Sequence, residues 1–218
     1  IDKAQFQFSP LSITLNDEPA ELNGWIGAEE SELDVRIQSW KVNPFTDFFG
    51  LKDVDARLNA ELNWQGGWRR PKLTGKLNSS GYWQNEPYSL DMQSDGSLNS
   101  LKFQDAQFWI SGNYLQMNGG VDWVSEELDV QLKGELTTDT ILRQFIPDSL
   151  NDLSLHGDIE GQVRGQLSKP TMQLVVSTNG KWRDDPVQSI ANLVWDKQKL
   201  ELTNVSIFSS LVQANGSL

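Results

Sequence analysis

The sequence predicts an all-β fold, a stack of roughly a dozen strands with two short helices. Three observations predict it. Rare residue types recur at one spacing, apolar and polar residues alternate over most of the chain, and glycine, asparagine and serine are abundant beside nine tryptophans. This combination is typical of many short strands joined by tight turns.

The recurring residues indicate a tandem repeat with an offset of 99 positions, as in 170 − 71 = 99. The matching pairs are Pro71 and Pro170, Gly81 and Gly180, Trp83 and Trp182, and Pro87 and Pro186. Four matches of these types at one offset are typical of a repeat array. Since proline starts strands or turns and glycine permits tight reversals, the repeated unit is a group of strands and turns.

An older copy of the repeat lies upstream, where Asn23-Gly24 matches Asn118-Gly119 at an offset of 95. We therefore divide the chain into the end of one repeat unit at 1–53, a full unit at 54–152 and the beginning of the next at 153–218. These parts are expected to form one continuous body. Terminal repeats of an array normally differ from the rest, and neither end does, so we interpret the chain as a piece of a longer array.

Strands are expected first at 11–15, 22–26 and 33–37, with acidic turns between them. A short helix follows at 43–50, where a proline lies near the start and a glycine at the end. From Val54 to Gln65 apolar and polar residues alternate without interruption, which predicts a strand with one buried and one solvated face. Further strands are expected at 72–80, 88–94, 97–103, 106–111, 115–123 and 128–136.

A second short helix is expected at 138–146, where Ile141, Leu142 and Phe145 have helical spacing. The last strands are then at 153–167, 171–178, 187–195, 199–205 and 208–218. Their shared one-sided pattern leaves two possibilities open. The apolar faces form the core of a closed sandwich or barrel, or they line an open trough that a ligand or partner fills.

Composition excludes several classes of function. The net charge of −12 argues against nucleic acid and against attraction to an anionic membrane surface. The absence of cysteine excludes disulfide frameworks and zinc–thiolate sites. No segment reaches the roughly 18 consecutive apolar residues of a membrane helix. We expect no cofactor and no metal.

Three segments resemble the TamB and AsmA-like family of large periplasmic proteins of Gram-negative bacteria. They are GDIEGQVRGQLSKP at 157–170, LELTNV at 200–205 and QANGSL at 213–218. The resemblance implies an elongated, U-shaped, curled β-sheet forming an open hydrophobic groove. It also implies a periplasmic location, with an inner-membrane anchor in a segment absent from this chain, and phospholipid transport toward the outer membrane.

The function expected from this resemblance is a non-enzymatic lipid conduit. An acyl chain in water costs about 0.8 kcal/mol per methylene, so a continuous apolar lane lowers the barrier to crossing an aqueous compartment. Phospholipid acyl chains are the expected partners. The candidate groove-lining residues are Leu58, Leu62, Trp64, Leu90, Met92, Met117, Val121, Leu128, Val130, Leu132, Val163, Leu174, Val176, Leu200 and Leu202. In an open groove, Val130→Asp or Val163→Asp should block transport and leave the chain folded.

Three other functions are weighed. The first is a scaffold or chaperone for outer-membrane or autotransporter protein assembly, with a TamA-like barrel partner bound through parts of the protein absent here. The second is a carbohydrate-binding β-sandwich, which nine tryptophans permit, although Trp83 and Trp182 fit packing beside a turn better than sugar stacking. The third is an enzyme, but His156 is the only histidine and the acidic pairs lie in expected turns.

Overall fold

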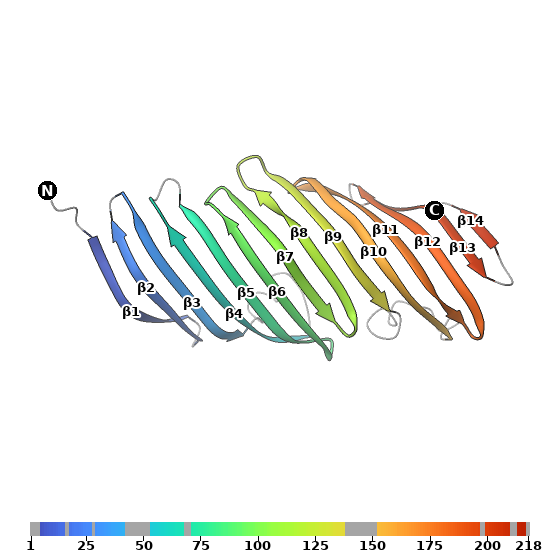
Figure 1. Cartoon of the computed structure of the whole chain (residues 1–218), viewed down its shortest axis with the longest axis horizontal. Coiled ribbons are helices and arrows are strands. Elements are labelled where there is room, and N and C mark those ends of the chain that lie inside the picture. The colour runs from blue at the N-terminus through green and yellow to red at the C-terminus, as the bar shows by residue number, and fades with distance from the viewer. Residues whose placement is uncertain are drawn as a thin grey trace. The chain divides into compact units, whose positions relative to one another are not determined.

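The computed structural model describes residues 5–15, 18–27, 29–41, 53–67, 71–137, 152–196, 199–209 and 213–216. These residues form fourteen strands, and the order of the strands in the sheet is their order in the sequence (Figure 1). Every pair of strands with a described register is antiparallel. The predicted all-β, repetitive open sheet is confirmed. The helices expected at 43–50 and 138–146 lie outside the described residues.

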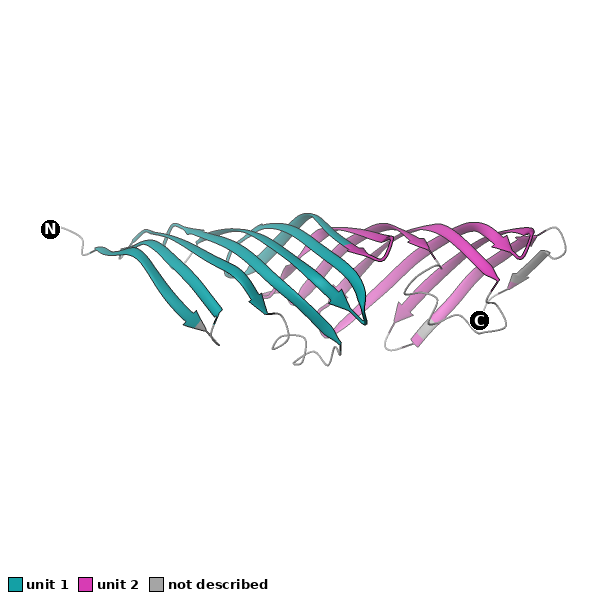
Figure 2. Ribbon diagram, turned by 90° about the horizontal axis from the view of Figure 1, so that it is seen from below, with its two compact units in different colours: residues 1–108 teal, residues 109–218 magenta. Residues whose placement is uncertain are grey.

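The chain divides into two compact units, 1–108 and 109–218 (Figure 2). The first unit holds β1 (Gln5–Leu15), β2 (Glu18–Gly27), β3 (Ser31–Lys41), β4 (Val54–Gln65), β5 (Lys72–Trp83), β6 (Glu86–Gly96) and most of β7 (Ser100–Ile110). The second holds β8 (Asn113–Asp122), β9 (Glu127–Thr137), β10 (Leu153–Gln166), β11 (Lys169–Trp182), β12 (Asp185–Asp196), β13 (Lys199–Ser209) and β14 (Gln213–Gly216).

Within each unit the described strands lie side by side in one layer, and no second sheet covers either face (Figure 1). Burial agrees with this arrangement. The apolar residues that are buried in the described ranges are Ala56, Ala106, Ile110, Val130 and Leu174. No large side chain there is fully enclosed. The closed sandwich that the alternation also allowed is therefore not formed by this part of the chain.

The backbone reproduces the 99-residue repeat. Strand β4 begins at Val54 and β10 at Leu153 (153 − 54 = 99), while β7 and β13 match at both ends. The hairpin residues Gln84 and Arg183, also 99 apart, both adopt the left-handed region, with φ of 53° and 58°. The upstream copy follows its own offset, because β2 and β8 differ by 95 at both ends. The sequence repeat therefore corresponds to repeated strands and turns.

Two strands are longer than the sequence indicated. Segments 97–103 and 106–111 were expected as separate strands, but both contribute to β7. The expected strands 199–205 and 208–218 likewise meet in β13, which ends at Ser209, and residues 213–216 of the latter form β14. A residue with positive φ interrupts each of them, Asp105 in β7 and Asn204 in β13. In β13 the register also shifts opposite this point, between Ile190 and Asn192. A β-bulge adds one residue to a strand and reverses the phase of alternation, so a bulged strand reads as two.

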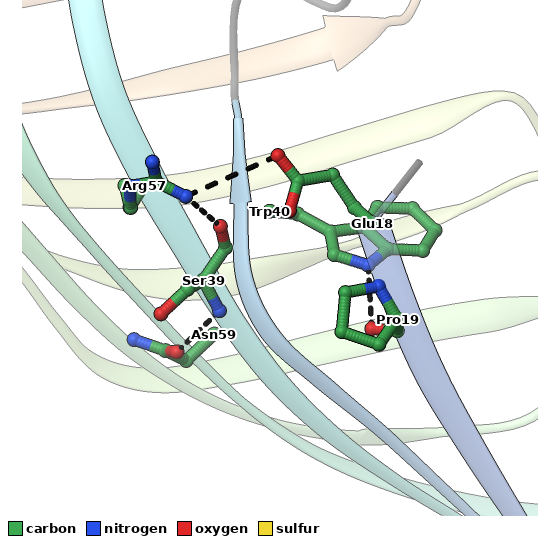
Figure 3. Close-up of polar contacts among 6 residues, drawn as sticks. All are labelled: Glu18, Pro19, Ser39, Trp40, Arg57 and Asn59. Atoms are coloured by element: carbon green, nitrogen blue, oxygen red, sulfur yellow. Dashed lines mark hydrogen bonds and ion pairs between the residues drawn. The ribbon is translucent and has the colours of Figure 1, made fainter. Parts of the chain in front are cut away.

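Another bulge, at Ser39 in β3, is held by side chains from β4 (Figure 3). The Ser39 amide donates to Asn59 Oδ1 at 2.9 Å, and the Arg57 guanidinium donates to the Ser39 carbonyl at 2.6 Å. The next residue, Trp40, donates its indole N–H to the Pro19 carbonyl of β2 at 2.8 Å. These bonds satisfy the polar groups that the bulge removes from the ladder and fix the register of three strands.

Candidate functional site

In the first unit, the candidate groove residues lie on one face of the sheet, which we call its apolar face. Leu58, Leu62 and Trp64 alternate along β4, and Leu62 lies opposite Val35 of β3. The β6 candidates, Leu90 and Met92, join the same face because their β5 partners, Ser79 and Leu77, pair with Leu58 and Ala60. Each strand thus adds its apolar residues beside those of its neighbour.

The second unit has an apolar face of the same construction. Val130 lies opposite Val163, Leu132 opposite Met117, and Leu128 opposite Val121. Leu174 lies opposite Leu193, whose other partner is Leu202, and Val176 lies opposite Ile159. The backbone of Leu200 pairs with Trp195, but its side chain lies outside the described part. The register therefore gathers the candidates on one face within each unit, and their role as a lipid-lining surface stays a prediction.

Exposure on the apolar face is graded. Leu62 is 45% exposed, whereas Val130 and Leu174 are 7% and 9% exposed, and Val163 is half-buried. A carboxylate at Val130 would lie among packed side chains, so we revise the expectation that Val130→Asp leaves the chain folded. Leu62 is the better position at which to change the surface without changing the packing.

Hydroxyl pairs interrupt both apolar faces at equivalent positions. Ser79 Oγ lies 3.1 Å from Tyr88 Oη in the first unit, and Thr178 Oγ1 lies 2.8 Å from Ser189 Oγ in the second. Ser79 and Thr178 are 99 positions apart, so this hydroxyl position recurs with the repeat, but the partners Tyr88 and Ser189 are not equivalent positions. Because each hydroxyl is hydrogen-bonded to the other, the pair presents less unsatisfied polarity to a hydrocarbon than a lone hydroxyl would.

Two equivalent glycines mark places where neighbouring backbones come too close for any side chain on the apolar face. A Cβ on Gly180 would overlap the carbonyl oxygen of Ser154, and a Cβ on Gly81 would overlap that of Asp55. The glycines that identified the repeat in the sequence are therefore required by a close approach between strands, and not by a turn.

The opposite face of each unit, which we call the polar face, carries a hollow that the sequence did not reveal. In the first unit a hollow of about 410 Å³ lies over the cross-strand row Arg36, Glu61 and Lys76. In the second unit a hollow of about 890 Å³ lies over a row that includes Gln131 and Gln162. Such rows become visible only when the register is known, because they join residues far apart in the sequence.

The histidine weighed for catalysis lies on a strand of the second unit. His156 is exposed on β10, where its backbone pairs with Thr137 and Asn179. Within the described ranges no three residues of the metal-ligating types gather closely enough to hold an ion. Two side chains have shifted pKa values. Amide hydrogen bonds lower the pKa of the Asp122 carboxyl, chiefly the one from Ser125, while a hydrogen bond to Glu201 raises the pKa of Lys199.

No helix in the described ranges combines the length and apolar character needed to cross a membrane. Comparison with known proteins found no matching family model, no matching curated protein and no matching solved structure. The fold therefore defines the class of this protein. It is an all-β protein whose repeated strands form an open sheet with one apolar and one polar face in each unit.

Proposed function

We propose that this chain is a non-enzymatic segment of a lipid-conducting surface, along which phospholipid acyl chains cross the aqueous space between two membranes. One observation carries the proposal. In each unit the apolar residues of successive strands align on one face, and no second layer of described residues covers that face. The resemblance to the TamB and AsmA-like family supports a periplasmic location and phospholipid as the lipid class.

An apolar face of this kind needs an occupant. Apolar surface in water costs about 25 cal/mol per Å², and contiguous apolar patches beyond a few hundred Å² mark interaction surfaces. Hydrocarbon is a suitable occupant because its attraction to the surface is non-directional and requires no fixed partner atoms. A chain can then move along the strands while its charged headgroup remains in water.

The apolar side chains differ in exposure, and this variation suits a surface along which a lipid moves better than a pocket that holds a lipid tightly. Leu62 on β4 and Ile207 on β13 are both exposed, while Val130 and Leu174 are packed beneath the surface. The apolar face therefore has no deep pocket at Leu62 or Ile207 that would enclose an acyl chain. The hydroxyl pairs at Ser79 and Thr178 also interrupt the apolar face. A shallow surface holds an acyl chain weakly at any one point, as a conduit requires.

Photocrosslinking from neighbouring positions of one strand tests the proposal. A photoreactive amino acid replaces either Leu62, on the apolar face, or Glu61, on the polar face, and the chain is incubated with phospholipid vesicles. We expect lipid adducts at position 62 and few at position 61, since the two side chains point to opposite faces. Equal labelling at both positions, or none at either, would contradict the proposal.

A transfer assay with matched charge changes tests movement itself. Leu62→Asp adds a charge to the exposed apolar face, while Ser80→Asp adds the same charge to the polar face, opposite Arg57. We expect transfer of a fluorescent phospholipid between donor and acceptor vesicles to fall in the first variant only. A loss in both variants would indicate a general effect of charge and would remove support for the apolar lane.

A further inference from the structure

The hollows on the polar faces of the two units are equivalent positions of the repeat. Ten lining residues of the first hollow, from Glu61 to Gln104, each have a lining counterpart 99 positions later, from Glu160 to Thr203 (160 − 61 = 99, 203 − 104 = 99). Every lining residue of the first hollow lies in 1–108, and every one of the second in 109–218. The backbone geometry of the repeat therefore builds the hollow, and the side chains decide what it can hold.

The two linings differ in chemistry at matched positions. Lys76 of the first hollow is replaced by Val175 in the second, and Asp95 by Val194. The first hollow thus has opposite charges at these two points, while Lys133 and Glu160 are the charged pair in the row of Val175 in the second. The second has apolar side chains at the same two points, of which Val175 is 48% exposed. An exposed valine in the middle of a polar hollow provides a patch against which an apolar part of a ligand can pack.

A row of amide side chains lies along one side of this apolar patch. Asn118, Gln131, Gln162 and Gln173 lie in one cross-strand row from β8 to β11, and Gln162 Nε2 donates to Gln173 Oε1 at 3.4 Å. Each carboxamide both donates and accepts hydrogen bonds. A row of them therefore matches a ligand that carries many groups able to do the same, such as hydroxyls.

An aromatic pair lies on the polar face one step along β8 from the hollow. The Trp109 and Tyr114 rings are 4.3 Å apart, and Trp109 is 46% exposed. Tyr114 is two residues from Gln116, a lining residue, and pairs with Glu135, whose β10 partner is the lining residue Asp158. Apolar contact surface and hydrogen-bonding groups thus lie side by side, as in sites for ligands with both characters.

We propose that the hollow of the second unit binds an uncharged oligosaccharide. The sugar hydroxyls exchange hydrogen bonds with the amide row, Asp158 and Glu160 accept further hydroxyl hydrogens, and the apolar faces of the rings pack against Val175 and Trp109. From β8 to β13 the hollow covers five strand spacings, roughly 24 Å, which suits an extended ligand of several rings.

Other ligand classes fit the hollow less well. Its carboxylates and the net charge of −12 repel nucleic acid and other polyanions. A peptide that adds a strand needs a free sheet edge, but β9 to β12 pair on both sides. An acyl chain would cover amide groups without replacing their hydrogen bonds. The site lies on the face opposite the proposed lipid surface, so the two proposals stand or fall separately.

Titration of the chain with cellotetraose, maltotetraose and chitotetraose, followed by tryptophan fluorescence and calorimetry, tests the proposal. We expect saturable binding of at least one tetrasaccharide. Val175→Lys, which introduces the residue of the first hollow, and Trp109→Ala should each weaken that binding by about fivefold or more. Lys76→Val, the reciprocal change in the first hollow, is the matched control and should leave the affinity unchanged.

Gln162→Ala provides a third variant that changes neither charge nor apolar contact, and circular dichroism confirms that each variant is folded. Absence of saturable binding with all three sugars would overturn the proposal. Binding that is insensitive to the three second-unit variants would also overturn it, because the sugar would then lie elsewhere. Leu62→Asp, on the apolar face, should leave sugar binding unchanged, which separates this result from the lipid assay.

Discussion

Asp105 in β7 and Asn204 in β13, 99 positions apart, adopt the same left-handed backbone conformation, with φ of 50° and 54°. Left-handed φ is disfavoured for L-residues by roughly 1–2 kcal/mol, and Asp and Asn are among the few side chains that tolerate it. The repeat therefore has the same backbone conformation, and a residue type suited to it, at the same point in both copies, and in β13 the register shift shows that it forms a bulge. The bulge reverses which face of the strand each following side chain occupies.

Replacing Asn204 by valine should destabilise the chain, because a β-branched residue in this conformation is strongly strained. We expect Asn204→Val to lower the free energy of unfolding by about 1–2 kcal/mol and Asn204→Gly to change it little. Ser206→Val is the matched control, since the same residue enters the same strand two positions later. Urea denaturation measures all three, and equal effects of the two valine variants would contradict the role of the bulge.

The strands were predictable and the bulges were not, for one physical reason. Alternation from Val54 to Gln65 reports which side chains share a face, and the 99-residue offset reports which strands are equivalent. Neither the alternation nor the offset reveals that one residue is inserted into a strand. Asp and Asn are common turn residues, so Asp105 and Asn204 resemble turns between two separate strands. The alternation pattern therefore predicts two strands on either side of Asp105 and of Asn204, where the structure has one continuous strand.

Alanine at Gly180 or Gly81 should destabilise the sheet more than alanine at Gly75. A Cβ at either position would overlap a carbonyl oxygen of the neighbouring backbone, which cannot move aside without breaking the ladder. At Gly75 the nearest atom is the Ser94 hydroxyl, 3.0 Å away, which can rotate. We expect losses of about 1–3 kcal/mol for Gly180→Ala and Gly81→Ala, and less than about 1 kcal/mol for Gly75→Ala, in urea denaturation. Three equal losses would show that the close approach does not decide the cost.

The bulge at Ser39 allows a hydrogen bond to be compared with an ion pair in one network (Figure 3). Asn59→Ala removes the acceptor of the Ser39 amide and should cost about 1 kcal/mol of stability. Glu18→Gln removes the charge that lies 3.9 Å from Arg57 and should cost less than about 0.5 kcal/mol, because the pair is partly exposed. Thermal unfolding of the two variants at low and high salt is the measurement. A larger, salt-sensitive loss for Glu18→Gln would reverse this ranking.

The Asp122 carboxylate should titrate below its ordinary pKa of 3.8. It accepts amide hydrogen bonds from Ser125 at 2.8 Å and Val124 at 2.9 Å, and these favour the charged form. Since the folded pKa is depressed, the stabilisation is present above pH 3.8 and is lost as the pH falls through the lower, folded value. NMR titration should show the two amide shifts moving together below pH 3.8, and Asp122→Asn should abolish that step. A midpoint at or above 3.8 would be inconsistent with these bonds.

The polar-face hollows show where prediction from the sequence ended. Alternation assigned Gln131 and Gln162 to the solvated face, but their alignment depends on the register of β9 and β10. The concavity of that face depends on sheet twist, which no local pattern reports. The same limit applies to depth on the apolar face. Val130 and Leu62 have the same place in the alternation, yet one is buried and the other is exposed.

This difference in depth predicts opposite outcomes for two similar substitutions. Val130→Asp places a carboxylate among Gly119, Val163 and their neighbours, and should cost several kcal/mol or prevent folding. Leu62→Asp places it at an exposed site and should cost less than about 1 kcal/mol, because surface substitutions have small effects. Circular dichroism and urea denaturation decide between these outcomes. If Leu62→Asp also unfolded the chain, Leu62 would be part of the packing, and the apolar face would have to be covered in the folded protein.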